Sequence, residues 1–223
     1  MKIELKKRII TSILLFILLI LMSSYTYVLI ASLVIIGIIA WIEFYALISK
    51  IYKKRNYSDI ALRFIFKATS LLYLSYLIFI IILTKLNFPN LYLLIIYIIL
   101  ISIMTDIGGL FVGKIFKGKK LTKISPNKTI SGSIGSFVFS LFLIPFFFKY
   151  LNTYVNMSIF DIILTTLSIS FISQLGDLFI SLIKRKANVK NTSDLLPGHG
   201  GILDRIDGII FAVPLGILLF KLF

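Results

Sequence analysis

The stretch SLIKRKANVKNTSDLLPGHGGILDRID, residues 181–207, is a polar segment held between two apolar runs. The preceding run covers residues 158–183 and the following run residues 203–222. Each run is long enough to cross a hydrocarbon layer about 30 Å thick, which takes about 20 residues. A segment this rich in charged side chains, anchored at both ends by hydrophobic segments, is where we expect the chemistry of an apolar protein.

Apolar segments also dominate the rest of the chain. Hydrophobic residues make up 59% of the 223 residues, against about 45–50% in typical soluble domains. Five further apolar segments precede the two above, at about 9–24, 27–49, 64–84, 90–112 and 130–150. The pattern predicts an all-α, polytopic integral membrane helical bundle with about seven transmembrane helices. It also predicts one membrane domain over residues 1–223.

Within that domain, we expect residues 1–100 to hold the amino-terminal spans and residues 101–210 to hold the polar motifs. The amino-terminal stretch MKIELKKRIITSILLFILLILMSS is similar to a signal peptide, but no small-x-small cleavage site follows. Because more apolar segments follow, we interpret it as a first transmembrane helix. The chain has no cysteine, which excludes disulfides and thiolate chemistry.

The formal charge of +15 is distributed over alternate connections. The basic ones are the amino terminus and the loops at 50–55, 114–128 and 184–190. Membrane proteins gather Lys and Arg in cytoplasmic loops, so these segments are predicted to face the cytoplasm. The lipid bilayer is therefore the expected partner of the basic residues, and no nucleic acid is expected.

The few acidic residues are concentrated on the same side. Asp106, Asp177, Asp204 and Asp207 all fall at predicted cytoplasmic ends of apolar segments. Each one alone fits a helix cap or a partner for a lysine as well as it fits a site. Four carboxylates beside two basic loops favour a site, because Mg²⁺ is commonly held by one or two carboxylates plus substrate phosphates. A transport site is disfavoured, since such sites lie near the membrane midplane.

Helical spacing groups several of these residues. Residues three or four apart share a helix face, so one stripe on the sixth predicted helix contains Gln174, Asp177, Ser181 and either Lys184 or Arg185. Asp204 and Asp207 form a second stripe at the start of the last segment. Carboxylates there also suit the helix dipole, which leaves a capping role open.

Two loops carry further candidates. Ser125-Pro126 is typical of an N-cap followed by proline at the first helical position, so a helix is predicted to begin there. Its N–H groups, with Lys128 and Thr129, would form an anion site. His199, the only histidine, lies in a glycine run that allows close approach to backbone N–H groups. We interpret it as a phosphate or ribose contact.

Glu43 lies inside the second apolar segment. An intramembrane carboxylate costs about 2.5–3.5 kcal/mol on insertion scales and normally faces the bundle interior. Packing and function remain equally open for this residue.

The polar segment resembles the signature of the phosphatidate cytidylyltransferases, also called CDP-diacylglycerol synthases. The core of the resemblance is PGHGGILDRID, residues 197–207. It extends over the matching positions Ser181, Lys184, Arg185, Lys190 and Ser193. A second motif matches at Asp106, Gly113-Lys114, Leu121, Ser125-Pro126, Lys128-Thr129 and Gly132, and a third at Gln174, Gly176 and Asp177. Together the motifs cover residues 100 to 210.

The resemblance implies the reaction CTP + phosphatidate → CDP-diacylglycerol + pyrophosphate, with Mg²⁺, at the cytoplasmic face of a bacterial inner (plasma) membrane. The implied catalytic residues are Asp177, Lys184, Asp204, Arg205 and Asp207. The implied substrate-binding residues are Lys128, Thr129, Ser181, Arg185, Lys190, His199, Gly200 and Gly201. The implied metal ligands are Asp106, Asp177, Asp204 and Asp207. A second cation and a homodimer stay open.

Three positions depart from the family pattern. Ser131, Ile180 and Asn191 stand where the family commonly has acidic residues. Two alternatives therefore remain beside the main expectation: a related CTP-dependent enzyme acting on another lipid phosphate or a polyprenol, and a catalytically impaired homologue that binds lipid.

Overall fold

The chain is helical throughout the part that the structure describes. The computed structural model describes residues 2–54, 56–122, 124–198 and 200–220, without the side chains of residues 2–9 and 89–90. Its helices are α1 (Lys2–Ser24), α2 (Thr26–Ile51), α3 (Tyr57–Asn87), α4 (Pro89–Phe116), α5 (Ile130–Leu141), α6 (Ile144–Val155), α7 (Ile159–Lys186), α8 (Leu203–Ile206) and α9 (Ile209–Phe220). These described residues contain no strand, which confirms the all-α prediction.

The helices group into two compact units. One unit comprises Met1–Phe88 and Ile183–Ile206, and the other Pro89–Leu182 and Asp207–Phe223. Each unit therefore combines segments that lie far apart in the sequence. The prediction of one membrane domain over the whole chain stays a prediction.

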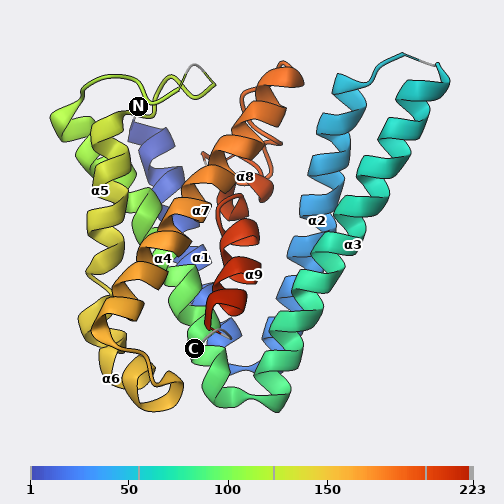
Figure 1. The fold of residues 1–223 in the computed structure, drawn as a ribbon. Helices are drawn as coiled ribbons and strands as arrows, with labels where there is room; N and C mark the ends of the chain where they lie inside the picture. Colours follow the sequence, from blue (N-terminus) through green and yellow to red (C-terminus); the bar gives the residue numbers. More distant parts are fainter. Residues whose placement is uncertain (1, 55, 123, 199, 221–223) are drawn as a thin grey trace. The chain divides into compact units, whose positions relative to one another are not determined.

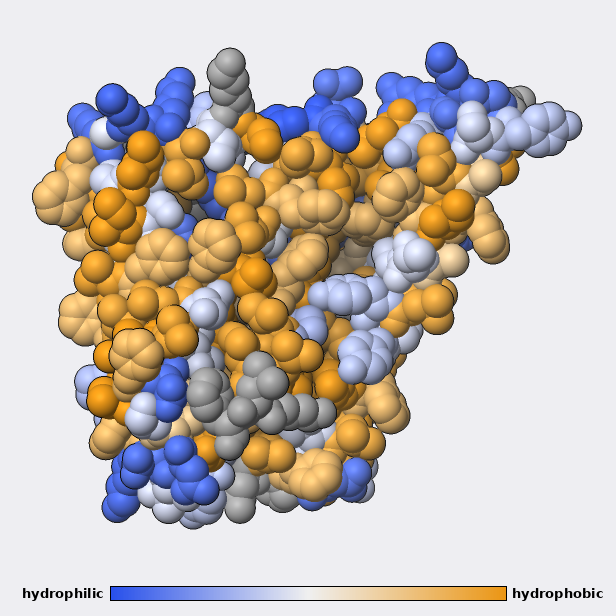
Figure 2. Space-filling model, viewed as in Figure 1, coloured by the Kyte–Doolittle hydropathy of each residue, from blue (hydrophilic) through white to orange (hydrophobic). Residues whose placement is uncertain are grey.

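In the first unit, α2 packs against α1 and α3. Helices α2 and α3 lie side by side (Figure 1), and Gly37 of α2 leaves room for the side chain of Ile78. Asn56 caps α3 by accepting the N–H of Asp59 at 3.3 Å. Hydrophilic residues gather around the α2–α3 connection at the upper right of Figure 2, and below it apolar residues predominate, with several less hydrophobic ones among them. This distribution is typical of a helix pair that enters a bilayer.

In the second unit, α4 and α5 approach closely because glycines face each other. A side chain on Gly108 would meet the backbone of Gly135, and one on Gly113 would meet Thr129. Small residues at such contacts are typical of helix packing in membranes. Hydroxyl pairs add polar contacts between α4 and α7, with Tyr97 and Thr166 2.6 Å apart. The contact with α4 reaches Thr129, the residue that follows Lys128.

Helix α5 begins later than the sequence suggested. Residues 125–128 form a turn, in which the N–H of Lys128 donates to Ser125 O at 3.0 Å. Thr129 is the N-cap, and its hydroxyl accepts the N–H of Gly132 at 3.0 Å. The helix start predicted at Ser125-Pro126 is therefore wrong. Proline suits the second position of a turn as well as the first position of a helix.

The long helices are apolar enough to cross a membrane. Among the described residues, four candidate spans are present, namely Thr26–Ile51, Tyr57–Asn87, Leu91–Phe116 and Ile159–Lys186. A fifth arises if α5 and α6, which meet at a 54° bend, count as one span. Pro145 at the start of α6 explains the bend, because proline cannot continue a helix from the preceding turn. These helices indicate an integral membrane protein, and the count of seven stays a prediction.

Candidate functional site

In the second unit, Asp177 is the centre of one polar group. Its carboxylate forms an ion pair with the ammonium of Lys128. The Ser181 hydroxyl donates to Asp177 Oδ1 at 3.3 Å, one turn along α7. The helix face predicted from spacing is confirmed for these two residues. A carboxylate, a cation and a hydroxyl thus meet where α7 faces the loop before α5.

One hydrogen bond between α5 and α7 lies beside this group. Ser133 Oγ donates to Gln174 Oε1 at 2.6 Å, one turn before Asp177. The Thr129 hydroxyl caps α5 and lies 3.0 Å from Ser131 Oγ. The Thr129 hydroxyl is therefore already used as the N-cap of α5. The buried Nε2 of Gln174 has no hydrogen-bond partner among the described residues.

Asp207 belongs to the same unit and is 5% exposed. Its Oδ1 accepts the N–H of Gly208 at 2.9 Å. Two glycines bring this segment against α7: a side chain on Gly176 would meet the carbonyl oxygen of Asp207, and one on Gly208 would meet Ser173. The backbone of Asp207 therefore packs against Gly176, the residue before Asp177.

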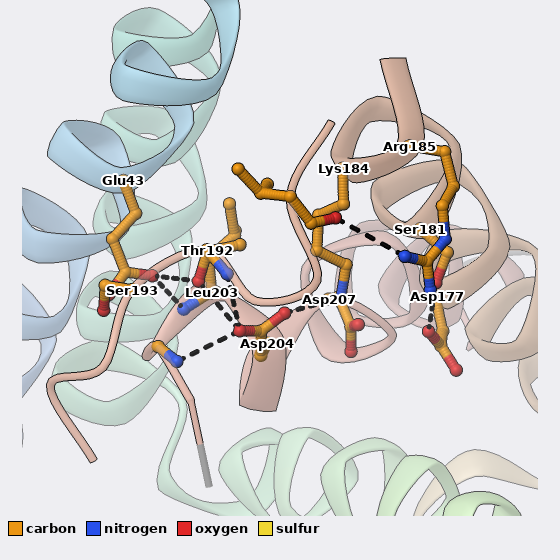
Figure 3. A network of polar contacts seen from close by, with 12 residues as sticks. Glu43, Asp177, Ser181, Lys184, Arg185, Thr192, Ser193, Leu203, Asp204 and Asp207 are labelled. Carbon is orange, nitrogen blue, oxygen red and sulfur yellow. Dashed lines mark hydrogen bonds and ion pairs between the residues drawn. The ribbon is translucent and has the colours of Figure 1, made fainter. Parts of the chain in front are cut away.

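In the first unit, Asp204 is the centre of a second polar group (Figure 3). Its Oδ1 accepts a hydrogen bond from Lys184 Nζ at 2.5 Å. Its Oδ2 accepts the Thr192 N–H at 2.9 Å, the Thr192 hydroxyl at 3.0 Å and the Gly201 N–H at 3.0 Å. Burial alone would raise the pKa of Asp204, but the hydrogen bonds from Lys184, Thr192 and Gly201 lower it below its usual value.

The remaining predicted residues take varied positions. Gly200 and Gly201 are buried, and their N–H groups donate to Leu196 O and Asp204 Oδ2, so both amides are used within the loop. Arg185 Nη1 lies 3.5 Å from Val189 O. Asp106, Lys190 and Arg205 are exposed. His199 lies outside the described residues. The proposed roles of all these residues stay predictions.

No role was assigned to Glu43 from the sequence, yet it accepts four hydrogen bonds from the polar loop in the first unit. The donors are Thr192, Ser193 and Leu203 (Figure 3), together with the N–H of Ile202. Its position as a carboxylate inside an apolar helix was the only signal available. The partners could not be inferred, because residues 192–203 are far away in the sequence.

Within the described residues, no group of three or more His, Cys, Asp or Glu side chains is close enough together to hold a metal ion. Asp177 and Asp204 each bind a lysine instead. Mg²⁺ needs only one or two carboxylates when the substrate phosphates supply the rest. The metal site therefore stays a prediction.

Comparison with known proteins identifies the family. Residues 2–223 match the cytidylyltransferase family, and the chain belongs to it. This confirms the resemblance found in the polar segment.

Three relatives, each called phosphatidate cytidylyltransferase, illustrate the similarity. The relative from Bacillus subtilis (strain 168) is 43% identical over 120 residues, which cover 53% of this chain and 44% of the relative. Those from Staphylococcus haemolyticus and Staphylococcus aureus (strain COL) are 42% and 44% identical over 122 residues, covering 54% of this chain and 46% of each relative. The matched part thus spans slightly less than half the length of these relatives.

Proposed function

We propose that this chain is a phosphatidate cytidylyltransferase that converts CTP and phosphatidate into CDP-diacylglycerol and pyrophosphate. The observation that carries the proposal is the family match over residues 2–223. The similarity to relatives named for this activity supports it. The polar groups around Asp177 and Asp204 add chemistry that suits two polyanionic substrates.

In the proposed reaction, a phosphate oxygen of the lipid attacks the α-phosphorus of CTP. The bond from that phosphorus to the oxygen bridging to the β-phosphate breaks, and pyrophosphate leaves with the electron pair. Negative charge on the leaving group must be neutralised in this step. Lys128 and Lys184 are suitable cations. Each already forms an ion pair with a carboxylate, and a phosphate group can take the place of that carboxylate. The Ser181 hydroxyl can donate to a phosphate oxygen.

The donor set in the second unit also suits Mg²⁺. Asp177 and Asp207 offer carboxylate oxygens, the ligand type that Mg²⁺ prefers, from segments in backbone contact at Gly176. Asp106 is a further candidate in that unit. The oxygens of Asp204 already accept four hydrogen bonds, so Asp204 could bind a metal ion only after releasing Lys184. Bound Mg²⁺ would supply further positive charge to the triphosphate.

We place the proposed site at the cytoplasmic face of the inner membrane of a bacterium. Lys128 ends the basic loop 114–128, and Lys184 begins the basic stretch 184–190. Basic loops remain in the cytoplasm during insertion, which supports this orientation. Phosphatidate can then enter from the membrane while CTP arrives from the cytoplasm.

The test is a product assay on the purified chain in mixed micelles. With CTP, phosphatidate and Mg²⁺ we expect equal amounts of pyrophosphate and CDP-diacylglycerol, and no product when ATP replaces CTP. Product formed with a polyprenol in place of phosphatidate would favour the related CTP-dependent enzyme. A folded protein without activity on any lipid would favour the impaired, lipid-binding homologue. The mass of the same preparation decides between a monomer and a homodimer.

A second prediction concerns Asn191, which stands at a commonly acidic family position. Its side chain lies against Gly200. The Cβ and Cγ atoms of Asn191 are each 3.4 Å from the position that a Cβ atom on Gly200 would take. Asn191→Asp is expected to lower the Mg²⁺ concentration for half-maximal activity by about threefold or more, because an added carboxylate attracts the cation. Magnesium titrations of the initial rate measure this change.

Asn188→Asp is the matched control for that substitution. Asn188 has a φ of 54°, a conformation that aspartate also tolerates. An equal effect of both substitutions would indicate a general charge effect. No effect at Asn191 would place that residue away from the metal.

A further inference from the structure

Glu43 is a buried carboxylate with an unusual set of partners. It lies on α2, inside a helix long and apolar enough to cross a membrane, and it is 5% exposed. Among the described residues it forms no ion pair with a lysine or arginine. A charge in such a place is tolerated only when hydrogen bonds compensate it. Its partners therefore show what the residue does.

All the donors come from one segment of the chain. Oε1 accepts the Ser193 hydroxyl at 2.6 Å and the Ile202 N–H at 3.1 Å. Oε2 accepts the Thr192 hydroxyl at 2.8 Å and the Leu203 N–H at 2.8 Å. The carboxylate thus binds both ends of the segment 192–203. Because each oxygen takes one hydroxyl and one backbone amide, both oxygens must act as acceptors.

Thr192 connects this carboxylate to Asp204. Its hydroxyl lies 2.8 Å from Glu43 Oε2 and 3.0 Å from Asp204 Oδ2, and its N–H donates to the same Asp204 oxygen. Asp204 in turn accepts a hydrogen bond from Lys184 at 2.5 Å. The hydroxyl has one proton and can donate it to only one of the two carboxylates at a time, while the Thr192 N–H binds Asp204 in either case. Thr192 therefore joins α2 to the candidate catalytic pair.

The glycine at position 201 allows this arrangement. A side chain there would meet the Thr192 hydroxyl and the carboxylate of Glu43. Gly201 is buried, and its N–H donates to Asp204. In this fold the residue therefore has a packing reason to be glycine, and the close fit restricts where Glu43 can lie.

We propose that Glu43 is a positioning residue that holds the segment 192–203 and thereby orients Asp204 and Lys184 for the transfer reaction. The proposal rests on the proposed function for its catalytic consequence. Its structural part is independent of activity, because it concerns only the hydrogen bonds of the segment. Glu43 touches neither substrate in this mechanism and acts only through Thr192, Ser193 and the two amides.

Glu43→Gln is the decisive variant. Glutamine has the same shape, but its NH2 group replaces one acceptor and faces one hydroxyl and one backbone N–H. The hydroxyl can rotate, whereas the N–H of Ile202 or Leu203 loses its acceptor. Amide hydrogen exchange in a peptide covering residues 200–206 is expected to become about tenfold faster. For the enzyme, we expect kcat to fall about 10- to 100-fold, with the KM for CTP changing by about threefold at most.

Ser49→Ala is the matched control on the same helix. The buried Ser49 hydroxyl has no hydrogen-bond partner in the described part of the chain, so its removal should change neither exchange nor kcat. Thr192→Val removes the hydroxyl that lies between the two carboxylates and keeps the N–H that binds Asp204. Because both substitutions break one chain of contacts, the double variant should lose less kcat than the product of the two single losses.

The outcomes separate this proposal from the proposed function. Unchanged exchange at residues 200–206 in Glu43→Gln would overturn the structural part. Faster exchange with wild-type kcat would overturn the positioning role. If the wild-type chain has no cytidylyltransferase activity, the exchange measurement still decides whether Glu43 holds the segment, and the transfer reaction itself is then rejected.

Discussion

Lys184→Met is expected to destabilise the protein by about 3–5 kcal/mol, the cost of leaving a buried charge without its partner. The side chains of Lys184 and Asp204 are 11% and 6% exposed, so water cannot replace the lost ammonium. Methionine fills a similar volume, which limits the effect of packing. The free energy of unfolding, from denaturant titration in detergent micelles, measures the change.

Lys128→Met is the matched control, because it breaks the other ion pair in the chain's described part. The side chains of Lys128 and Asp177 are 28% and 24% exposed, and such pairs contribute about 1 kcal/mol or less. We expect a small change in stability but a clear loss of activity, since Lys128 is proposed to bind phosphate. Equal destabilisation by both substitutions would contradict the difference in burial.

The pH dependence of Lys184→Met follows from the same contacts. The pKa of Asp204 is lowered in the folded state, so its contribution to stability is complete above the unfolded pKa of about 3.9 and is lost as pH falls through the folded pKa. Removing Lys184 removes one cause of the lowered pKa. The loss of stability as pH falls through the unfolded pKa should then be smaller in the variant than in the wild type, because the folded pKa of Asp204 moves toward the unfolded one. Denaturant titrations between pH 3 and pH 7 would show this difference.

The sequence predicted the helical class correctly, for a physical reason. A long apolar segment inside a membrane must satisfy its backbone hydrogen bonds internally, which favours a helix. The prediction that Asp177 and Ser181 share one helix face was also confirmed, because both residues lie on the same helix. Periodicity along one element is therefore the information that a single sequence supplies best.

Contacts between distant segments could not be predicted in the same way. Glu43 was recognised as unusual, but nothing in α2 indicates that its partners lie at residues 192–203. The start of α5 was misplaced because proline suits both a turn and a first helical turn. For Glu43 the deciding hydrogen bonds join segments far apart in the sequence, whereas at residues 125–128 the local sequence fits both a turn and a helix start.

Asp207→Asn is expected to reduce kcat by about a thousandfold without unfolding the protein. Asparagine keeps the shape of the side chain, and its carbonyl oxygen can still accept the N–H of Gly208 at the 2.9 Å position of Oδ1. The change therefore removes the negative charge and leaves the junction before α9 intact. Initial rates with CTP, phosphatidate and Mg²⁺ measure the loss, and thermal unfolding checks that the fold persists.

Asp161→Asn provides the matched control within the same unit. Asp161 lies in the first turn of α7, where its carboxylate accepts hydrogen bonds from the N–H and hydroxyl of Ser158. It lies sixteen positions before Asp177 on the same helix, so its charge is remote from the proposed site. We expect wild-type kcat for this variant. An active Asp207→Asn enzyme would remove Asp207 from the catalytic group, and would leave Asp177 and Asp106 as the acidic residues that this unit can offer to a cation.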